Sequence, residues 1–351
     1  MSIKITGLGS YIPNKVVANE DFENHSFLNA DGSSFKQNNQ VIIKKFVAIT
    51  GIEERRYAAE HLNTSDMAYV AAQRAIEKAS CNPETIDYII VSHNFGDVKY
   101  GDGKADMIPS LASRVKQKLQ IKNPSCVAYD LIFGCPGWVE GVIQANAFIK
   151  AGIAKKCLVI GAESLSRVID PHDRDSMIYA DGAGASIIEK TDDEGGIFSH
   201  ETASFTLDEA NFIFNGNSYL PEADDSYYIK MHGRKIYEFA LTNVPLAMKK
   251  CLDKSKFTIN DVSKILIHQA NEKMDEAIVK RFYELFDMKM PENIMPMCIN
   301  KLGNSSVATV PTLYDLITTG QLAPHEINKG DVLLLASVGA GMNINAIVYQ
   351  H

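Results

Sequence analysis

Three side chains of this sequence could take part in chemistry together: Cys135, His268 and Asn304. Cys135 stands in a Gly-Cys-Pro-Gly turn between a strand-like run and a helical pattern. The free N–H groups and the positive dipole end of a helix start favour an anion. A thiol at that point is expected to have a lowered pKa and to be more often the nucleophilic thiolate. Cys135 is therefore a candidate nucleophile, with a buried structural cysteine as the alternative.

His268 and Asn304 also lie in turns. His268 follows a short apolar run, and Asn304 lies in a Gly-Asn-Ser-Ser turn before a helical pattern. A histidine after a strand is commonly a structural residue with a buried partner, and an asparagine beside a glycine is commonly only a turn residue. The pattern alone does not bring the three side chains together in space.

Strands and helices that would position these residues alternate along the chain. Strands are predicted at 3–8, 88–91, 127–130, 156–161, 181–188, 265–267 and 332–335, and helices at 64–78, 109–119, 138–152, 234–252, 271–285 and 309–319. This alternation predicts an α/β fold with mainly parallel sheets. The polar stretches 19–41 and 93–107 are predicted to be loops. A polar run after Lys190 divides the chain into halves 1–190 and 191–351.

The composition excludes several classes of protein. With 46% hydrophobic and 22% charged residues, the 351-residue chain can bury a large core. A net charge of −8 argues against wholesale nucleic-acid binding. No window approaches the ~18 apolar residues of a membrane span, and no signal peptide is predicted at the N-terminus. Six scattered cysteines without a Cys-x-x-Cys pair indicate neither a disulfide framework nor a metal site, so a reducing cytoplasm is the expected setting.

Several motifs resemble those of the β-ketoacyl-acyl-carrier-protein synthase III family. They are Gly51–Arg56, Asp170–Arg174, Asp181–Gly184, Ile267–Asn271 and Gly303–Pro311, and they keep the family's order. The resemblance runs from the first predicted strand to the last. It implies the thiolase fold, in which two similar α/β halves form a five-layered α-β-α-β-α arrangement, and it implies a homodimer.

The resemblance also implies roles for the three side chains. Cys135 would accept an acyl group from a thioester, and His268 with Asn304 would bind the carbonyl of a second, malonyl-type thioester and promote its decarboxylation. Two neutral donors would stabilise the resulting enolate, which then attacks the acyl-cysteine. The oxyanion of that attack would face the N–H groups of Cys135 and Ala340, in the turn that also contains Gly339 and Gly341 as substrate-contacting residues.

In this family the substrates travel on coenzyme A or on the phosphopantetheine of acyl carrier protein, and no metal or further cofactor is implied. Arg174 matches one side of the family's clamp on the adenine of coenzyme A. The stacking tryptophan falls near Lys45 and a phosphate-binding arginine near Ile49, so half of the clamp is missing. Ile108 falls where a phenylalanine reaches across the dimer to close the acyl pocket. These departures predict a specialised substrate.

The acidic carrier needs a local basic surface on this acidic chain. Lys273, Lys280 and Arg281 lie on the predicted helix after His268, where the family carries its docking residues. An ordinary solvated surface is the alternative, since acidic side chains share that helix.

Fatty acid or related lipid and polyketide biosynthesis is thus the expected setting. One alternative is a secondary-metabolite ketosynthase or acyltransferase that joins thioesters without malonyl decarboxylation, as in resorcinol-type lipid formation. A non-catalytic partner subunit is the other, and the presence of all three polar side chains argues against it.

Overall fold

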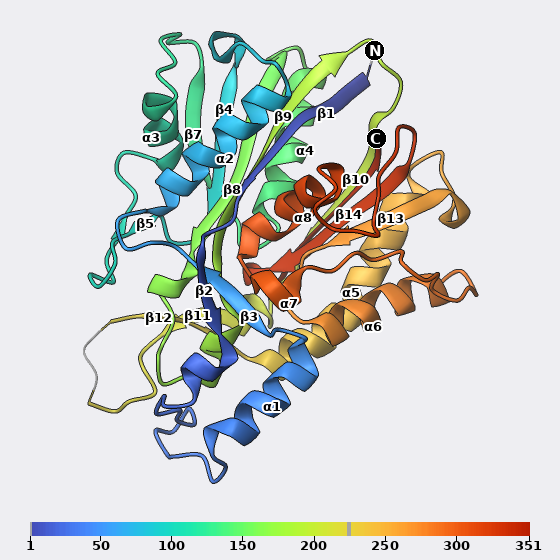
Figure 1. Cartoon of the computed structure of the whole chain (residues 1–351). Coiled ribbons are helices and arrows are strands. Elements are labelled where there is room, and N and C mark those ends of the chain that lie inside the picture. Colours follow the sequence, from blue (N-terminus) through green and yellow to red (C-terminus); the bar gives the residue numbers. More distant parts are fainter. Residues whose placement is uncertain (1, 223–225) are drawn as a thin grey trace.

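Two main sheets dominate the computed structural model, which describes residues 2–222 and 226–351 (Figure 1). The first sheet has five strands in the order β1 (Ser2–Tyr11), β9 (Asp181–Thr191), β8 (Lys156–Ser164), β4 (Tyr88–His93) and β7 (Val127–Ile132). The second has four strands in the order β10 (Gly196–Ser204), β15 (Asn343–Gln350), β14 (Val332–Gly339) and β13 (Val262–Ile267). The chain passes from one sheet to the other between Thr191 and Gly196.

Both sheets are mixed, so the expectation of mainly parallel sheets is wrong. β4 runs parallel to β7 and β8, whereas β9 runs antiparallel to β8 and β1. In the second sheet β13 and β14 are parallel, and β15 is antiparallel to β14 and β10. Only residues 340–342 separate β14 from β15, and so short a connection can join only antiparallel neighbours.

Helices complete a five-layered arrangement, which confirms the expected thiolase fold (Figure 1). α2 (Thr64–Lys78) and α3 (Leu111–Lys118) cover the outer face of the first sheet. α4 (Gly137–Lys150) and α8 (Thr309–Thr318) lie between the sheets, where Trp138 and Leu313 share one apolar core with Val159 and Leu335. α5 (Gly233–Asp253) and α6 (Glu272–Glu284) cover the outer face of the second sheet.

The stretch 19–41, predicted to be an exposed loop, is partly buried. Phe22 and Phe27 pack with Ile42 and Met177 in an apolar cluster of their own. α1 (Asn39–Thr50), where no helix is predicted, begins at the end of this stretch and has Asn38 as its N-cap. Aromatic residues scattered among polar ones have no helical or strand period, and for this reason the pattern did not reveal the cluster.

Seven shorter elements lie outside the two main sheets and their covering helices. They are β2 (Lys15–Ala18), β3 (Glu54–Tyr57), β5 (Asp97–Val98), β6 (Ala105–Asp106), β11 (Ile213–Gly216), β12 (Tyr228–Met231) and α7 (Ile299–Leu302). In the described part of the chain, no helix has the length and apolar character that crossing a bilayer requires.

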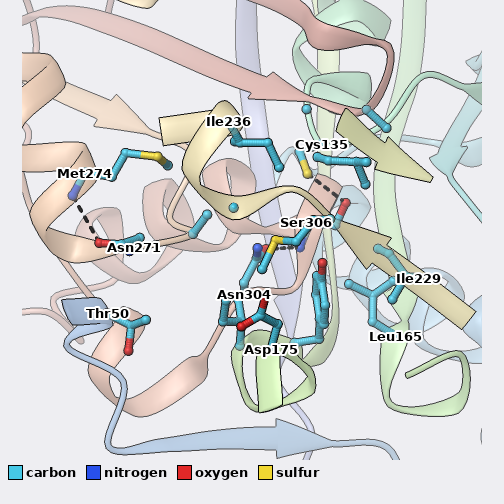
Figure 2. Close-up of a pocket in the computed structure, with 18 of the residues that line it drawn as sticks. Thr50, Cys135, Leu165, Asp175, Ile229, Ile236, Asn271, Met274, Asn304 and Ser306 are labelled. Carbon is cyan, nitrogen blue, oxygen red and sulfur yellow. Dashed lines mark hydrogen bonds between the residues drawn. The ribbon is translucent and has the colours of Figure 1, made fainter. Parts of the chain in front are cut away.

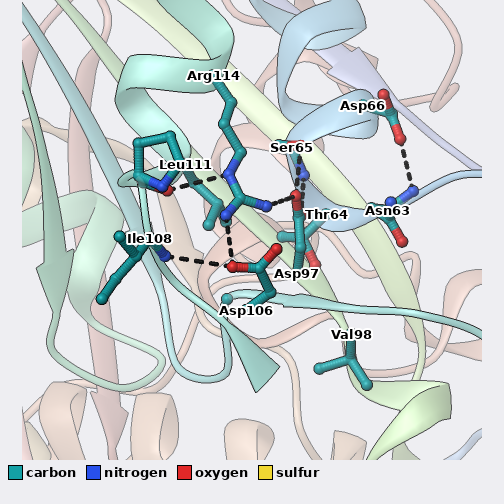
Figure 3. Close-up of polar contacts among 12 residues, drawn as sticks. Asn63, Thr64, Ser65, Asp66, Asp97, Val98, Asp106, Ile108, Leu111 and Arg114 are labelled. Carbon is teal, nitrogen blue, oxygen red and sulfur yellow. Dashed lines mark hydrogen bonds and ion pairs between the residues drawn. The ribbon is translucent and has the colours of Figure 1, made fainter. Parts of the chain in front are cut away.

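The loop 93–107 is held by a polar network around Arg114 (Figure 3). The Arg114 guanidinium donates to Asp97 at 2.7 Å and to Asp106 at 2.8 Å. Asp97, which is buried, also accepts from the backbone N–H and the hydroxyl of Ser65, both at 2.7 Å. The network fixes the base of the loop while Ile108, just beyond it, is 88% exposed.

Candidate active site

A cavity of about 630 Å³ brings the three candidate residues together. Cys135, His268 and Asn304 all line it, although they are far apart in the sequence. Cys135 follows β7 and His268 follows β13, so the cavity lies at the carboxyl ends of strands from both sheets. Figure 2 shows Cys135, Asn304 and Ser306 around its centre, with Asn271 and Met274 on one side and Leu165 and Ile229 on the other.

Two glycines allow the backbone at Cys135 to touch the turn after β14. A Cβ on Gly339 would lie 2.6 Å from the Cys135 backbone nitrogen, and a Cβ on Gly134 would lie 2.9 Å from the Ala340 nitrogen. Real Cβ atoms do not approach so closely, and Gly134 in addition has a positive φ of 74°. The backbones of 134–135 and 339–340 therefore lie directly against each other in the cavity wall.

The pKa of Cys135 does not follow the sequence expectation. Burial raises the pKa of this thiol to about 11, and a hydrogen bond from the Ser306 hydroxyl, 3.3 Å from the sulfur, acts in the opposite direction. The expected lowering of the pKa is therefore wrong. The loss of hydration in the cavity wall outweighs the hydrogen bonds that favour the thiolate.

His268 is a neutral imidazole in this cavity. It is only 3% exposed, and burial lowers its pKa to about 4. Its backbone N–H donates to the Ala336 carbonyl at 2.8 Å, which continues the pairing of β13 with β14. Its Nδ1 lies 2.6 Å from the Thr309 hydroxyl. The Thr309 hydroxyl also lies 3.0 Å from the Ser306 carbonyl, which can only accept, so its single hydrogen serves one of these two contacts. When it donates to Nδ1, the imidazole proton is on Nε2 and the ring is a hydrogen-bond donor at that atom; when it donates to the carbonyl, the proton is on Nδ1.

Asn304 has a fixed amide. Its Oδ1 accepts from the Ser306 backbone N–H at 2.7 Å, which assigns the other amide atom as nitrogen. Its own backbone N–H donates to Ile178 at 2.9 Å, and its carbonyl accepts from Ala180 at 2.8 Å. Because Asn304 lines the cavity, its Nδ2 is the group left to donate a hydrogen bond there. Asn304 thus supplies one neutral donor, and His268 supplies a second when its proton is on Nε2.

The other predicted residues are distributed more widely. Arg174, Gly339 and Ala340 line the cavity, as do Lys45 and Ile49 of α1. The Arg174 guanidinium lies over the Phe35 ring, 5.0 Å from its centroid. Ile108 and Gly341 are not among the lining residues in the described part of the chain.

The three basic residues of α6 are exposed outside the cavity. Lys273 stands between Asn271 and Met274 in sequence, and both of these line the cavity. Arg281 donates from its guanidinium to the Leu241 carbonyl of α5 at 3.1 Å. Lys273 is therefore the basic residue of α6 next to the cavity, whereas Arg281 also ties two helices together.

Four polar residues of the site were not named as candidates from the sequence: Asn94, Glu163, Ser306 and Thr309. Asn94 follows β4, and Glu163 lies near the end of β8. β4 and β8 run parallel to β7, which precedes Cys135. The rule that sites lie at the carboxyl ends of parallel strands could have identified both. Across the described residues, no group of three His, Cys, Asp or Glu side chains could hold a metal ion.

Comparisons with known proteins show which family the chain is similar to. The family described as "3-Oxoacyl-[acyl-carrier-protein (ACP)] synthase III" matches residues 129–205, and its C-terminal counterpart matches residues 252–351. The chain is 31% identical over 351 residues to the beta-ketoacyl-[acyl-carrier-protein] synthase III of Staphylococcus haemolyticus, covering 100% of this chain and 99% of that protein. It is 32% identical over 354 residues to the enzyme of the same name from Neisseria meningitidis serogroup A, covering 99% of each.

Among solved structures, the 3-oxoacyl-[acyl-carrier-protein] synthase III of Aquifex aeolicus superposes with a TM-score of 0.80 at 27% identity, covering 100% of both chains. Fold, cavity and full-length similarity lead to one conclusion. This chain belongs to the 3-oxoacyl-[acyl-carrier-protein] synthase III family of thiolase-fold condensing enzymes.

Proposed function

We propose that this enzyme forms an acyl thioester on Cys135 and then condenses that acyl group with a malonyl-type carrier-bound thioester. The observation that carries the proposal is the cavity lined together by a cysteine next to a helix start, a buried neutral histidine and an asparagine whose amide is fixed. The cysteine would be the nucleophile, and the other two, with the His268 proton on Nε2, would be hydrogen-bond donors without charge. This is the division of labour that a two-step condensation requires.

In the first step the Cys135 sulfur attacks the acyl thioester and the carrier thiol leaves. In the second, His268 and Asn304 bind the carbonyl oxygen of the malonyl thioester. Loss of carbon dioxide places negative charge on that oxygen, and two donors aimed at it stabilise the enolate. The enolate carbon attacks the acyl-cysteine, the new carbon–carbon bond forms, and the Cys135 thiolate departs.

The contact between residues 134–135 and 339–340 supports an oxyanion site at the acyl-cysteine. There the N–H groups of Cys135 and Ala340 would donate to the oxygen of the tetrahedral intermediate. Backbone donors held in place before the reaction need no rearrangement as the charge forms, which makes them effective. Gly339 and Gly341 would shape the turn that presents Ala340, since Gly341 has a φ of 73°.

Acyl carrier protein is the partner that we propose for α6. Lys273 and Lys280 are seven residues, and therefore about 10 Å, apart along one face of the helix. Lys273 lies next to the cavity-lining Asn271 and Met274, so a carrier bound on this face could deliver its phosphopantetheine there. Substrates would travel on this carrier or on coenzyme A, whose adenine would meet Arg174, and no metal would be needed.

We propose a homodimer, which is supported by the free edge of the first sheet. β7 is its outermost strand, and among the described residues it pairs only with β4. Ile132, at its end, is 62% exposed and Val127 is exposed too. An unpaired apolar edge readily accepts a further strand, which we propose is β7 of a second copy. The exposed Ile108 would then reach the partner's cavity.

We also propose a cytoplasmic location and a boundary between the two halves at residue 190.

The direct test is the mass of the adduct on Cys135 after exposure to a panel of acyl thioesters, followed by addition of a malonyl thioester. An acyl mass on Cys135 and subsequent release of carbon dioxide support the proposal. An acyl adduct without carbon dioxide release would favour an acyltransferase or a condensing enzyme that does not decarboxylate. A wild-type protein whose Cys135 stays unmodified by every thioester would indicate a non-catalytic subunit.

A further inference from the structure

A chain of hydrogen bonds leads from a buried carboxyl group to the sulfur of Cys135. The Ser306 hydroxyl lies 3.3 Å from that sulfur, a contact that Figure 2 shows as a dashed line. Asn94 donates from its Nδ2 to the Ser306 hydroxyl oxygen at 3.1 Å. The same Nδ2 donates to Oε1 of Glu163, which also accepts from the Asn94 backbone N–H at 2.7 Å.

The direction of every bond in this chain is determined. The two N–H groups of the Asn94 amide point one to Glu163 and one to Ser306, and an amide nitrogen cannot accept. Ser306 therefore uses its oxygen as an acceptor for Asn94. The single hydroxyl hydrogen is left for the Cys135 sulfur. Because Oε1 of Glu163 receives two N–H groups, the amide keeps this orientation whether or not a proton occupies Oε2.

The backbone of Ser306 adopts an unfavourable conformation at this position. Its φ is 53°, in the left-handed region that favours glycine. Its backbone N–H donates to Asn304 Oδ1 at 2.7 Å, and its carbonyl lies 3.0 Å from the Thr309 hydroxyl. A glycine would adopt this turn more easily, so the presence of a buried serine indicates a use for its hydroxyl.

We propose that Ser306 is a further catalytic residue, which donates its hydroxyl hydrogen to the Cys135 thiolate, and that Asn94 and Glu163 are positioning residues that fix the direction of this bond. The inference rests on the proposed role of Cys135 as the nucleophile. A hydrogen bond to a charged acceptor is about twice as strong as one between neutral groups, so the serine favours the thiolate over the thiol.

The same donor acts twice in one turnover. In acylation the thiolate forms a carbon–sulfur bond to the acyl carbonyl carbon, the bond to the carrier sulfur breaks, and the departing thiolate takes a proton from water. In condensation the malonyl carboxylate leaves as carbon dioxide, the carbon–carbon bond forms, and the acyl–sulfur bond breaks. The electron pair of that bond returns to Cys135 as a thiolate. Ser306 stabilises the sulfur as nucleophile in the first step and as leaving group in the second.

The test is the pH dependence of Cys135 alkylation by iodoacetamide, which needs no acyl substrate. Ser306→Ala is expected to raise the thiol pKa by about one to two units, and so to slow alkylation at neutral pH about tenfold to a hundredfold, because a charge-assisted hydrogen bond is lost. Ser305→Ala is the matched control, since it removes the neighbouring buried serine hydroxyl of the same turn. An unchanged pKa in Ser306→Ala, or an equal rise in Ser305→Ala, would overturn the proposal.

Two further variants test the proposal without changing residue 306, so the test does not depend on whether Ser306→Ala folds. Asn94→Ala removes the bond that directs Ser306 and is expected to raise the thiol pKa, by less than Ser306→Ala does. Glu163→Gln preserves an acceptor for Asn94 but removes a negative charge that opposes the thiolate, so a lowered thiol pKa is expected. If the thiol pKa shifted in the same direction in both variants, the result would contradict the proposed chain of hydrogen bonds from Glu163 through Asn94 and Ser306 to Cys135. A wild-type protein that alkylates as expected but accepts no acyl group would refute the proposed function and leave this inference standing.

Discussion

The protonation state of His268 makes a specific prediction about decarboxylation. Burial lowers the pKa of His268 to about 4. At pH 7 the imidazolium then amounts to about one molecule in a thousand, since each pH unit above the pKa is a factor of ten. The reaction is therefore expected to use the neutral ring, which donates from Nε2 when the Thr309 hydroxyl donates to Nδ1. Its rate should not rise as the pH falls.

The experiment uses the Cys135→Ala variant, which removes the ionisation of the thiol from the pH profile. Carbon dioxide release from a malonyl thioester is followed between pH 6 and pH 8. We expect a nearly flat profile in this range. If the imidazolium were the active form, the rate would increase about tenfold for each unit of falling pH, which would refute the neutral-donor mechanism.

Variants of the two donors complete this test. In the Cys135→Ala background, His268→Ala and Asn304→Ala should each slow carbon dioxide release ~10²–10³-fold, the usual cost of losing one such donor. His268→Gln keeps a neutral donor and should retain more activity than His268→Ala. Asn304→Asp replaces the donor with a carboxylate of almost the same shape, so it should be at least as slow as Asn304→Ala. A normal rate in any alanine variant would remove that residue from the mechanism.

Four other outcomes follow from the site. Cys135→Ala should carry no acyl adduct, as checked by intact mass, and an adduct on another wild-type cysteine would contradict the assignment. Gly339→Ala should slow acylation strongly, because its Cβ would lie 2.6 Å from the Cys135 nitrogen; acylation at the wild-type rate would show that the contact can relax. Lys273→Glu with Lys280→Glu should lower kcat/KM for carrier-bound substrate at low salt but not for a small thioester mimic, and an equal loss on both would exclude docking at α6. Because the folded pKa of His268 is below the unfolded value, the wild type should lose up to about 3 kcal/mol of stability relative to His268→Gln as the pH falls from about 6.5 towards 4. If the free energy of unfolding changed equally with pH in the two proteins across that range, this prediction would be refuted.

The sequence by itself determined the order and kind of most of the main elements, although β10 and β15 of the second sheet are not among the predicted strands. The predicted helix 64–78 coincides with α2, and the predicted helices 234–252 and 271–285 differ from α5 and α6 by one residue at each end. In these helices apolar residues recur at helical spacing over many residues, and the buried strands have continuous apolar runs. Both can therefore be recognised from the local sequence. The motifs around His268 and Asn304, together with those at 51–56, 170–174 and 181–184, indicated the family, which the comparisons confirm.

The tertiary structure decided what those residues can do. Strand direction was not predictable, because pairing depends on contacts between distant segments, as with β9 and β1. The position of Cys135 at a helix start suggested an easily ionised thiol, whereas burial in the cavity raises its pKa to about 11. Burial likewise makes His268 neutral. The partners that orient the site, Ser306 and Asn94, are 212 positions apart in the chain. Local pattern encodes helices and strands, but desolvation and hydrogen-bond direction arise only when the chain has closed around the cavity.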